Sequence, residues 1–385
     1  MKTTRRKTSS YATILAAMMT LTGQPVTVLA ADTNAPASTP INSPASAAAA
    51  APVSDNWVNV SASFTQQLGA DNLTPAYLCR CVGLIVAPTG DILMLTAKQG
   101  VCISKDQGAT WSVVPDNNVK GRCENSLGIS IAYPYDGRMA YYAFDGGGGM
   151  AGGMSLDGGL TWKPFAQNHR GLHYADIDWI AHDPQTVFGV THEPFYTLLS
   201  TDAGKTWQPI YGDETGSRDA FNYKVGVFDA KTLLRANASV RGSRAKDPAG
   251  LIELSTDAGQ TWTPVANFQV QGYFPVHYGK NLYWTTTQGV ITSPNGKDWT
   301  LTGPGAEGAI YGPYFGASEQ EFVVVTDSNF LKTEDGGKTW KPIAKFYKAP
   351  DIYKNLASYA YFGWDSKHNI LYASGVAASI YQLKL

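Results

Sequence analysis

The sequence predicts an all-β fold built from repeated units, and three observations support this prediction. The chain of 385 residues is 44% hydrophobic and 12% aromatic but only 16% charged, which allows a large buried core. Short runs rich in Val, Ile, Tyr and Trp alternate with Gly, Asn and Asp turns, and no long apolar stretch with a helical period follows residue 60. One short motif also recurs at regular intervals along the chain. We therefore expect almost no helix.

The recurring motif is a cluster of Asp, Gly, Thr and Trp, as in the sequence STDAGKTW at Ser200–Trp207. Near-copies read SKDQGATW, SLDGGLTW, STDAGQTW and TEDGGKTW, and SPNGKDW is a degraded copy. The six copies end at tryptophans separated by 51, 45, 55, 37 and 41 residues, namely Trp111, Trp162, Trp207, Trp262, Trp299 and Trp340. Each interval suits one blade of a β-propeller. A catalytic centre is normally unique, so six copies indicate architecture.

Each residue type in the motif has a physical reason to be there. The Asp is expected to accept backbone hydrogen bonds and fix a tight turn. The Gly two residues later supplies a positive φ, which a β-carbon would oppose. The Thr-Trp pair then begins a strand whose indole packs between sheets. This structural role is assigned to Asp106, Asp157, Asp202, Asp257 and Asp335.

These motifs resemble Asp-box (BNR) repeats, which lie between the third and fourth strands of propeller blades. The resemblance extends from about Asn56 to the end of the chain. It implies a β-propeller of the sialidase-like and photosystem II assembly factor-like superfamily. It leaves the activity open, because such proteins include sialidases, other glycosidases, lyases, sortilin-type receptors and an assembly factor.

Six boxes need not mean six blades. The segment Asp55–Val60 matches the tail that follows each box, such as Trp207–Ile210, but no box precedes it. At the other end of the chain, residues 360–364, 369–373 and 379–383 give three strand-like runs and no fourth. The N-terminal strand is therefore expected to complete the last blade. This predicts a seven-bladed β-propeller over residues 55–385, closed by its N-terminal strand.

The N-terminal region is typical of an exported protein. Residues 1–30 have a basic start, an apolar part at Tyr11–Leu21 and a small-residue cleavage site at Val28–Ala30. The pair Arg5-Arg6 is compatible with the twin-arginine route, but the residues after it match poorly and favour the general route. Residues 31–54 are an Ala/Pro/Ser/Thr tract that reads as a disordered linker. We expect a secreted or periplasmic location.

Charge and cysteine content narrow the class of protein further. Removing the signal takes away four basic residues and changes the formal charge from −1 to −5, which does not favour nucleic-acid binding. In an exported chain, four cysteines indicate two disulfides with three possible pairings. A metal site is less favoured, because the spacing C-x-C is not a usual ligand spacing. We expect no metal, no cofactor, no membrane span and a monomer. The cysteines are Cys79, Cys81, Cys102 and Cys123.

Propeller geometry places one group of polar residues on a single face. The box turns lie on one edge of the ring, and the connections that enter inner strands or join second to third strands lie on the other. Six of the eight arginines in the mature chain fall in such connections, which predicts a basic basin on an acidic body. Guanidinium groups bind carboxylate or sulfate in a bidentate way. The predicted ligand-binding residues are Arg80, Arg122, Arg170, Arg218, Arg241, Arg244, Glu124 and His169.

Plainer readings exist for these residues. A single surface arginine is usually solvated or paired, and Asp219, Asp247, Glu124 and Asp176 are plausible partners. His277, at the end of an inner strand, is expected to be core or to face the other edge. Aromatic side chains beside the arginines are expected to stack on sugar rings. These are Tyr174, Trp179, Phe195, Tyr196, Tyr223 and Tyr273.

The chemistry that fits this set best is elimination from a uronate-containing glycan. His173 or His192 would remove the proton beside the uronate carboxylate, Tyr273 or Tyr174 would act as the acid, and the arginines would stabilise the developing charge. A sialidase is disfavoured because its Phe-Arg-Ile-Pro type motif is absent. A glycosidase needs two carboxylates across the bond, and no pair stands out among the available acids. Those acids are Glu124, Asp145, Asp176, Glu193 and Asp219.

A second class of function remains open from the sequence. An exported propeller could present the basic basin to a protein terminus or a polysaccharide without turnover, as a lectin-like or assembly protein. The photosystem assembly factor is similar to this chain in size, export and an arginine-lined face. Three histidines in one blade favour proton transfer over binding alone, and they are His169, His173 and His192.

Overall fold

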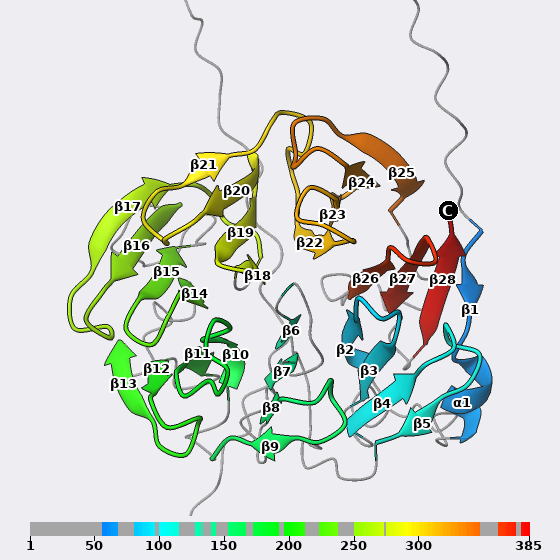
Figure 1. Cartoon of the computed structure of the whole chain (residues 1–385), viewed down its shortest axis with the longest axis horizontal. Coiled ribbons are helices and arrows are strands. Elements are labelled where there is room, and N and C mark those ends of the chain that lie inside the picture. Colours follow the sequence, from blue (N-terminus) through cyan, green and yellow to red (C-terminus); the bar gives the residue numbers. More distant parts are fainter. Residues whose placement is uncertain are drawn as a thin grey trace, which may run out of the picture. The chain divides into compact units, whose positions relative to one another are not determined.

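The computed structural model describes residues 56–67, 81–96, 100–114, 128–131, 133, 140–143, 153–166, 172–191, 196–211, 223–237, 250–272, 275–346, 361–374 and 379–385. Residue contacts divide the chain into Met1–Ala51 and Pro52–Leu385, and all described residues belong to the second unit. Among them, the strands form seven four-stranded antiparallel sheets arranged as blades around an axis (Figure 1). The predicted seven-bladed β-propeller is therefore confirmed.

Each of the first six blades uses four consecutive strands, whose order in the sheet follows the sequence. Blade 1 comprises β2 (Cys81–Val86), β3 (Ile92–Thr96), β4 (Gly100–Ser104) and β5 (Ser112–Val113). Blade 2 comprises β6 (Gly128–Ile131), β7 (Ala140–Ala143), β8 (Gly153–Ser155) and β9 (Lys163–Pro164). Blade 3 comprises β10 (Leu172–Ile177), β11 (Val187–Thr191), β12 (Thr197–Ser200) and β13 (Gln208–Tyr211). Blade 4 comprises β14 (Tyr223–Val227), β15 (Leu233–Asn237), β16 (Leu251–Ser255) and β17 (Thr263–Asn267). Blade 5 comprises β18 (Val276–Tyr278), β19 (Asn281–Thr286), β20 (Gly289–Ser293) and β21 (Thr300–Leu301). Blade 6 comprises β22 (Tyr311–Phe315), β23 (Phe322–Val325), β24 (Asn329–Thr333) and β25 (Lys341–Lys345).

The seventh blade joins the two ends of the ring. It comprises β26 (Phe362–Asp365), β27 (Ile370–Ser374), β28 (Ile380–Lys384) and, as its outer strand, β1 (Val58–Asn59). Val58 pairs with Gln382, and the next main-chain bond runs from Val60 N to Ile380 O at 2.8 Å. The side chain of Ser61 extends the contact, since its hydroxyl accepts the Ile380 N–H at 2.7 Å. Closure by the N-terminal strand is confirmed.

Helix contributes little to the described residues, as expected. A single short helix, α1 (Ala62–Gln67), follows β1, and Phe64 is its buried residue. Its ring stacks on Trp111 of blade 1 with centroids 6.0 Å apart. No helix in the described part of the chain is long and apolar enough to cross a membrane.

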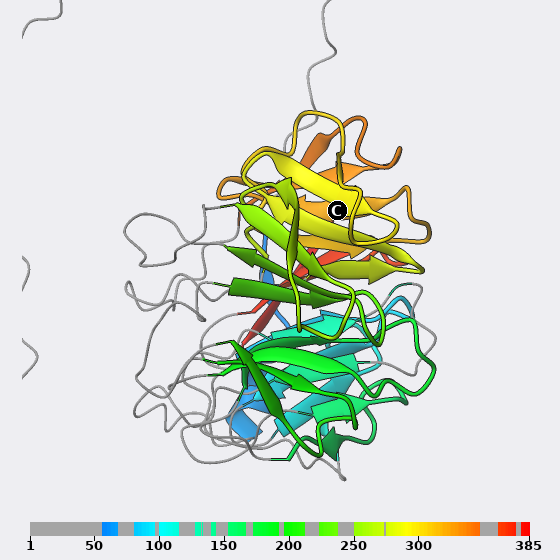
Figure 2. The same cartoon turned by 90° about the vertical axis from the view of Figure 1, so that its left-hand side faces the viewer.

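The core lies between neighbouring blades. All five residues of β3 are buried, because both faces of a blade are covered by the blades beside it (Figure 2). Between blades 3 and 4, for example, Phe188 and Leu199 pack against Val225 and Leu233. A substitution on either face of a middle strand therefore disturbs an interface between blades.

The box turns have one shared set of hydrogen bonds, illustrated by blade 3. Asp202 Oδ1 accepts the Thr206 N–H at 2.8 Å, and Asp202 Oδ2 accepts the Thr206 hydroxyl at 2.6 Å. The Ser200 hydroxyl donates to Asp202 at 2.7 Å and accepts the Gly204 N–H at 2.8 Å. Both central residues have positive φ, +59° at Ala203 and +81° at Gly204. Equivalent bonds occur at Asp106, Asp157, Asp257 and Asp335.

The glycine of the turn also has no room for a side chain. A β-carbon on Gly259 would lie 2.9 Å from Ile210 Cγ2 in the outer strand of the preceding blade. In the degraded copy, the Asn295 side chain replaces the aspartate and accepts the Lys297 and Asp298 N–H groups at 2.9 and 2.8 Å. Blade 5 therefore keeps the turn, with an amide oxygen as the hydrogen-bond acceptor in place of a carboxylate.

Acid is expected to weaken these turns. Hydrogen bonds from the hydroxyl and N–H of Thr206 hold the pKa of Asp202 at about 2, below the ordinary value of 3.8, and Thr261 does the same for the pKa of Asp257. A lowered folded-state pKa gives stability that is present above about pH 4 and is lost as the pH falls toward 2. The urea midpoint of the wild type should therefore drop more steeply between pH 4 and 2 than that of an Asp202→Asn, Asp257→Asn variant. Equal slopes would contradict this.

The strand pairing in blade 1 rules out one of the disulfide pairings that the sequence left open. β3 lies between β2 and β4, and Cys102 in β4 aligns through Met94 with Leu84 rather than with Cys81. Two strand spacings alone separate the backbones of Cys81 and Cys102 by roughly 10 Å, more than a disulfide can span. The pairing Cys81–Cys102 is thus excluded. The side chains of the other cysteines lie outside the described residues, so a disulfide through Cys79 or Cys123 stays a prediction.

Candidate functional site

The sheet topology defines two edges of the ring. In every antiparallel blade, the turns between strands 1 and 2 and between strands 3 and 4 lie at one edge, which we call the box edge. The connections between strands 2 and 3, and from strand 4 to the next blade, lie at the other, which we call the mouth edge. Inner strands therefore begin at the mouth edge and end at the box edge.

Apart from His173, the predicted ligand-binding and catalytic residues belong to mouth-edge connections by their place in the sequence. Arg80 directly precedes β2, and His192 directly follows β11. His173 lies in β10, at a bulge between Leu172, which pairs with Thr191, and Tyr174, but its side chain is outside the described part. Whether these side chains converge stays a prediction. The following also lie outside the described residues: Arg80, Arg122, Glu124, His169, Arg170, His192, Arg218, Arg241, Arg244 and Tyr273.

Three aromatic residues that were expected to meet sugar rings do not do so. Trp179, Tyr196 and Tyr223 are only 4%, 5% and 1% exposed. Tyr223 stacks edge-on against Tyr211 of blade 3, and the Arg235 guanidinium lies 4.9 Å from its ring centroid. The Tyr223 side chain points between blades 3 and 4, and Trp179 belongs to a core cluster that includes Met154 and Phe165 of blade 2. The stacking prediction is wrong for all three.

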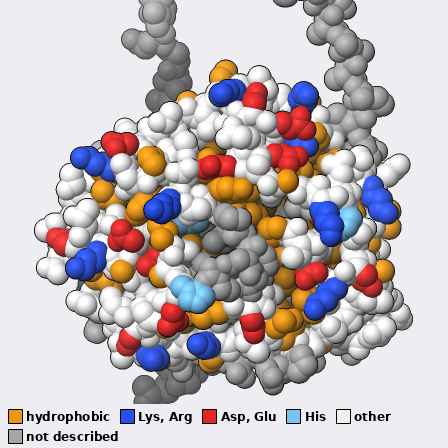
Figure 3. Space-filling model, viewed as in Figure 1, with side chains coloured by type: hydrophobic (Ala, Val, Ile, Leu, Met, Phe, Trp, Pro, Cys, Tyr) orange, Lys and Arg blue, Asp and Glu red, His pale blue; other side chains and the backbone are white. Residues whose placement is uncertain are grey.

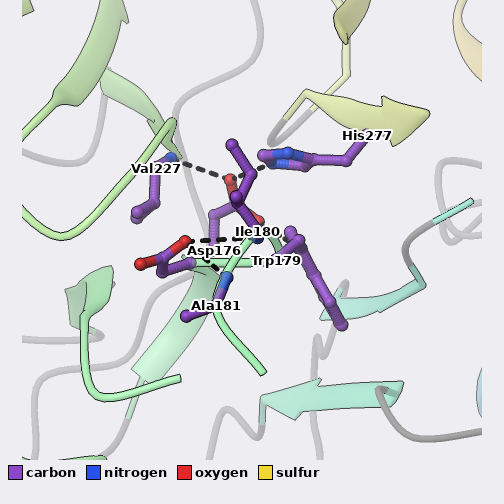
Figure 4. A network of polar contacts seen from close by, with 7 residues as sticks. Asp176, Trp179, Ile180, Ala181, Val227 and His277 are labelled. Atoms are coloured by element: carbon purple, nitrogen blue, oxygen red, sulfur yellow. Dashed lines mark hydrogen bonds and ion pairs between the residues drawn. The ribbon is translucent and has the colours of Figure 1, made fainter. Parts of the chain in front are cut away.

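Asp176 was expected among the acids of the basic face and is instead buried near the axis. Its Oδ1 accepts the Trp179 indole N–H at 2.8 Å, and its Oδ2 accepts the Val227 N–H at 2.8 Å (Figure 4). The same Oδ2 lies 3.1 Å from His277 Nε2. A carboxylate only accepts, so this nitrogen carries the hydrogen of the bond. Asp176 thus joins the inner strands of blades 3, 4 and 5 and is unavailable to the predicted arginines.

A residue from blade 2 reaches the same place. The Tyr133 N–H donates to His277 O at 2.8 Å, its carbonyl accepts the Gly279 N–H, and its ring packs 5.4 Å from Phe315 of blade 6. The residues of this cluster are all less than 10% exposed. We call the cluster the axial hub, and it consists of Tyr133, Asp176, Val227, His277 and Phe315. The expectation that His277 belongs to the core is confirmed.

The axial hub lies toward the box edge, because Val227 and Phe315 are the last residues of their inner strands. Its residues are buried, and Asp176 Oδ2 binds both Val227 N and His277 Nε2 within it. On the face seen in Figure 3, Lys and Arg side chains are interspersed with Asp and Glu around the rim. Within the described residues, that face shows no large patch of one charge.

One described residue near the mouth edge was missed by the sequence reasoning. Lys224 is the second residue of β14 and is partly buried. Burial lowers the pKa of its amine from 10.5 to about 7. The sequence signal was present, since a lysine interrupts the otherwise apolar inner strand Tyr-Lys-Val-Gly-Val. A lysine with a pKa near neutrality can gain or lose its charge during binding or proton transfer.

Comparison with known proteins supports the fold. No protein-family pattern matches the sequence, and no curated protein matches it. Among solved structures, a GH74 xyloglucanase from Xanthomonas campestris is 15% identical with a TM-score of 0.51, covering 80% of this chain and 43% of that chain. This chain thus spans less than half of the xyloglucanase. A virginiamycin B lyase from Staphylococcus aureus is 11% identical with a TM-score of 0.47, and the match covers 86% of this chain and 98% of that chain. YCF48 bound to D1 peptide is 12% identical with a TM-score of 0.41, and the match covers 87% of this chain and 99% of that chain.

Proposed function

We propose that this protein is an exported propeller that binds an anionic, uronate-containing glycan at the mouth edge and cleaves it by elimination. The observation that carries the proposal is the segregation of residues between the two edges. By their place in the sequence between the described strands, the predicted arginines, His169 and His192 fall in connections of the mouth edge, and His173 falls near the mouth-edge end of β10. At the box edge, the described polar groups near the axis are buried in the axial hub.

The backbone of blade 3 supports the choice of histidines. Leu172 pairs with Thr191, so β10 and β11 meet side by side at the mouth edge. In the sequence, His173 directly follows Leu172 and His192 directly follows Thr191. A histidine titrates near neutral pH and can accept the proton beside a uronate carboxylate. Arginines bind that carboxylate and stabilise the negative charge that develops. Hydrolysis is the second chemistry for the same ligand class, but Asp176 no longer counts among the available acids.

The proposed reaction is tested by incubating the purified mature protein with uronate, sialylated and neutral polysaccharides. Absorbance of the unsaturated uronate and the number of reducing ends are followed together. Elimination produces both signals on uronate substrates, whereas reducing ends alone mean hydrolysis. Binding without either signal supports the alternative function, a non-catalytic propeller that holds a polysaccharide or protein partner.

Replacing His173 and His192 by Ala is expected to abolish turnover while leaving glycan affinity within about threefold of the wild type, because the arginines supply most of the charge interaction. His182→Ala is the matched control, since His182 is exposed in the box-edge turn between β10 and β11. Affinity and turnover that both survive in the double variant would make these histidines structural.

A further inference from the structure

The degraded box of blade 5, in the turn between β20 and β21, exchanges the roles of its two polar side chains (Figure 1). In blade 3, the Asp202 carboxylate accepts the Thr206 hydroxyl at 2.6 Å. In blade 5, the Asn295 amide Nδ2 donates instead to Asp298 Oδ2 at 2.8 Å. The carboxylate has moved from the start of the turn to its end, so this turn keeps its side-chain bond only while residue 295 carries an amide.

The main-chain nitrogen of the box glycine is also bound differently in blade 5. In the five other boxes, the hydroxyl of the first residue accepts this glycine N–H at 2.7–2.8 Å. The hydroxyl of Ser293 instead lies 3.4 Å from both the main-chain N and Oδ1 of Asn295. The Gly296 N–H therefore lacks the hydroxyl acceptor that the equivalent glycine has in the other boxes.

Asn295 and Gly296 form the one Asn-Gly pair in the sequence. Asparagine is chemically labile, because the next main-chain nitrogen can attack its Cγ, and glycine has no β-carbon to shield that nitrogen. The turn also polarises the amide, since Asn295 Oδ1 accepts the N–H groups of Lys297 and Asp298 at 2.9 and 2.8 Å. Two donors at these distances stabilise the negative charge that develops on the oxygen during the attack. Asn295 is exposed, so water reaches it.

We propose that Asn295 is a self-modification site, at which the blade 5 turn converts its own asparagine to an acid and is weakened by the change. The Gly296 nitrogen attacks Asn295 Cγ, and its proton leaves with the amide nitrogen as ammonia. The new C–N bond closes a cyclic imide. Water then adds to one of the two imide carbonyl carbons and opens the ring, which gives aspartate or isoaspartate. The sum is an amide plus water going to a carboxylic acid plus ammonia, with no oxidation or reduction.

The product fits this turn poorly. An aspartate at position 295 would place a carboxylate oxygen where the amide donor now lies, 2.8 Å from Asp298 Oδ2, and like charges at this separation repel. Isoaspartate lengthens the main chain and displaces the Gly296 carbonyl, which accepts the Trp299 indole N–H at 2.9 Å. Trp299 packs against Trp284 with ring centroids 6.3 Å apart. The modification therefore loosens the outer part of blade 5, independently of any glycan chemistry.

The first experiment follows the conversion in the purified mature protein at mildly alkaline pH. Peptide mapping by mass spectrometry measures the acid formed at each asparagine over time. Asn295 is expected to convert at least about tenfold faster than three asparagines that are followed by Leu, Phe and Ile. The folded protein is also expected to convert Asn295 faster than the urea-unfolded chain, because the turn holds the two N–H donors in place. The three comparison residues are Asn281, Asn329 and Asn369.

The second experiment tests the consequence by a double-mutant cycle in urea unfolding. Asn295→Asp should lower the midpoint of the wild type, because it sets two carboxylates against each other. In an Asp298→Thr background, the same substitution should cause a smaller loss or a gain, because a hydroxyl donor then faces the carboxylate as in the other boxes. Conversion of Asn295 no faster than that of the comparison residues, or faster in the unfolded chain, would overturn the inference. An equal change of midpoint in both backgrounds would overturn it as well.

Discussion

Deleting Trp57–Ser61 is expected to lower the stability of the whole ring in one cooperative step. This segment supplies the fourth strand of blade 7 and packs Trp57 against Phe330 of blade 6, with ring centroids 5.7 Å apart. The carbonyl of Val60 accepts the Trp111 indole N–H of blade 1 at 3.1 Å. Loss of the strand removes contacts to three blades and exposes apolar surface of two core clusters. We expect a loss of more than about 3 kcal/mol in the free energy of unfolding.

The measurement is urea unfolding followed by tryptophan fluorescence and far-ultraviolet circular dichroism. Deletion of residues 46–50 in the predicted linker is the control of equal length and should leave the midpoint unchanged. If the ring is closed by β1, both probes shift together to a lower midpoint in the Trp57–Ser61 deletion. A midpoint equal to that of the control would mean that the ring is closed in another way.

Replacing Asp176 by Ala is expected to be among the most damaging single substitutions in the chain. The change leaves the Val227 N–H, the Trp179 indole N–H and His277 Nε2 without their acceptor in a fully buried environment. Each unsatisfied buried group costs about 1–3 kcal/mol, so the loss of three hydrogen bonds should destabilise the variant by at least about 3 kcal/mol or prevent folding.

Two further variants test whether the loss of stability comes from the missing hydrogen-bond acceptor. Asp183→Ala removes an exposed aspartate from the box-edge turn that follows β10 and should have little effect. Asp176→Asn keeps an acceptor oxygen and should fall between the wild type and Asp176→Ala in urea midpoint. An Asp176→Ala variant as stable as Asp183→Ala would show that the axial hub does not hold the inner strands together.

The fold could be predicted because its signals are local. A box requires Asp, Gly, Thr and Trp within a few residues, and the same hydrogen bonds form wherever they occur. The hydroxyl of the first residue, such as Ser200, was not recognised as part of the turn, although it bonds both Asp202 and Gly204. Closure was also predictable, because an orphan fourth strand at one end complements three strands at the other.

The axial hub could not be predicted, because its partners are distant in sequence. Asp176 and His277 are 101 residues apart, and Tyr133 reaches β18 from blade 2. The aromatic predictions failed for a related reason. A position near the mouth edge does not decide whether a side chain points to solvent or between blades, and Tyr223 points between blades. Lys224 was overlooked because its environment is set by neighbours across four strands.

The central claim is that the ligand binds at the mouth edge, and one binding comparison tests it most directly. Affinity for an oligogalacturonate is measured by calorimetry for the wild type and for two triple variants of equal charge change. One variant replaces Arg122, Arg170 and Arg218 by Gln. The other replaces by Gln the exposed box-turn lysines Lys105, Lys205 and Lys338. The account predicts that the arginine variant loses at least about 100-fold in affinity and the lysine variant less than about threefold. Equal losses, or a larger loss in the lysine variant, would contradict a site at the mouth edge.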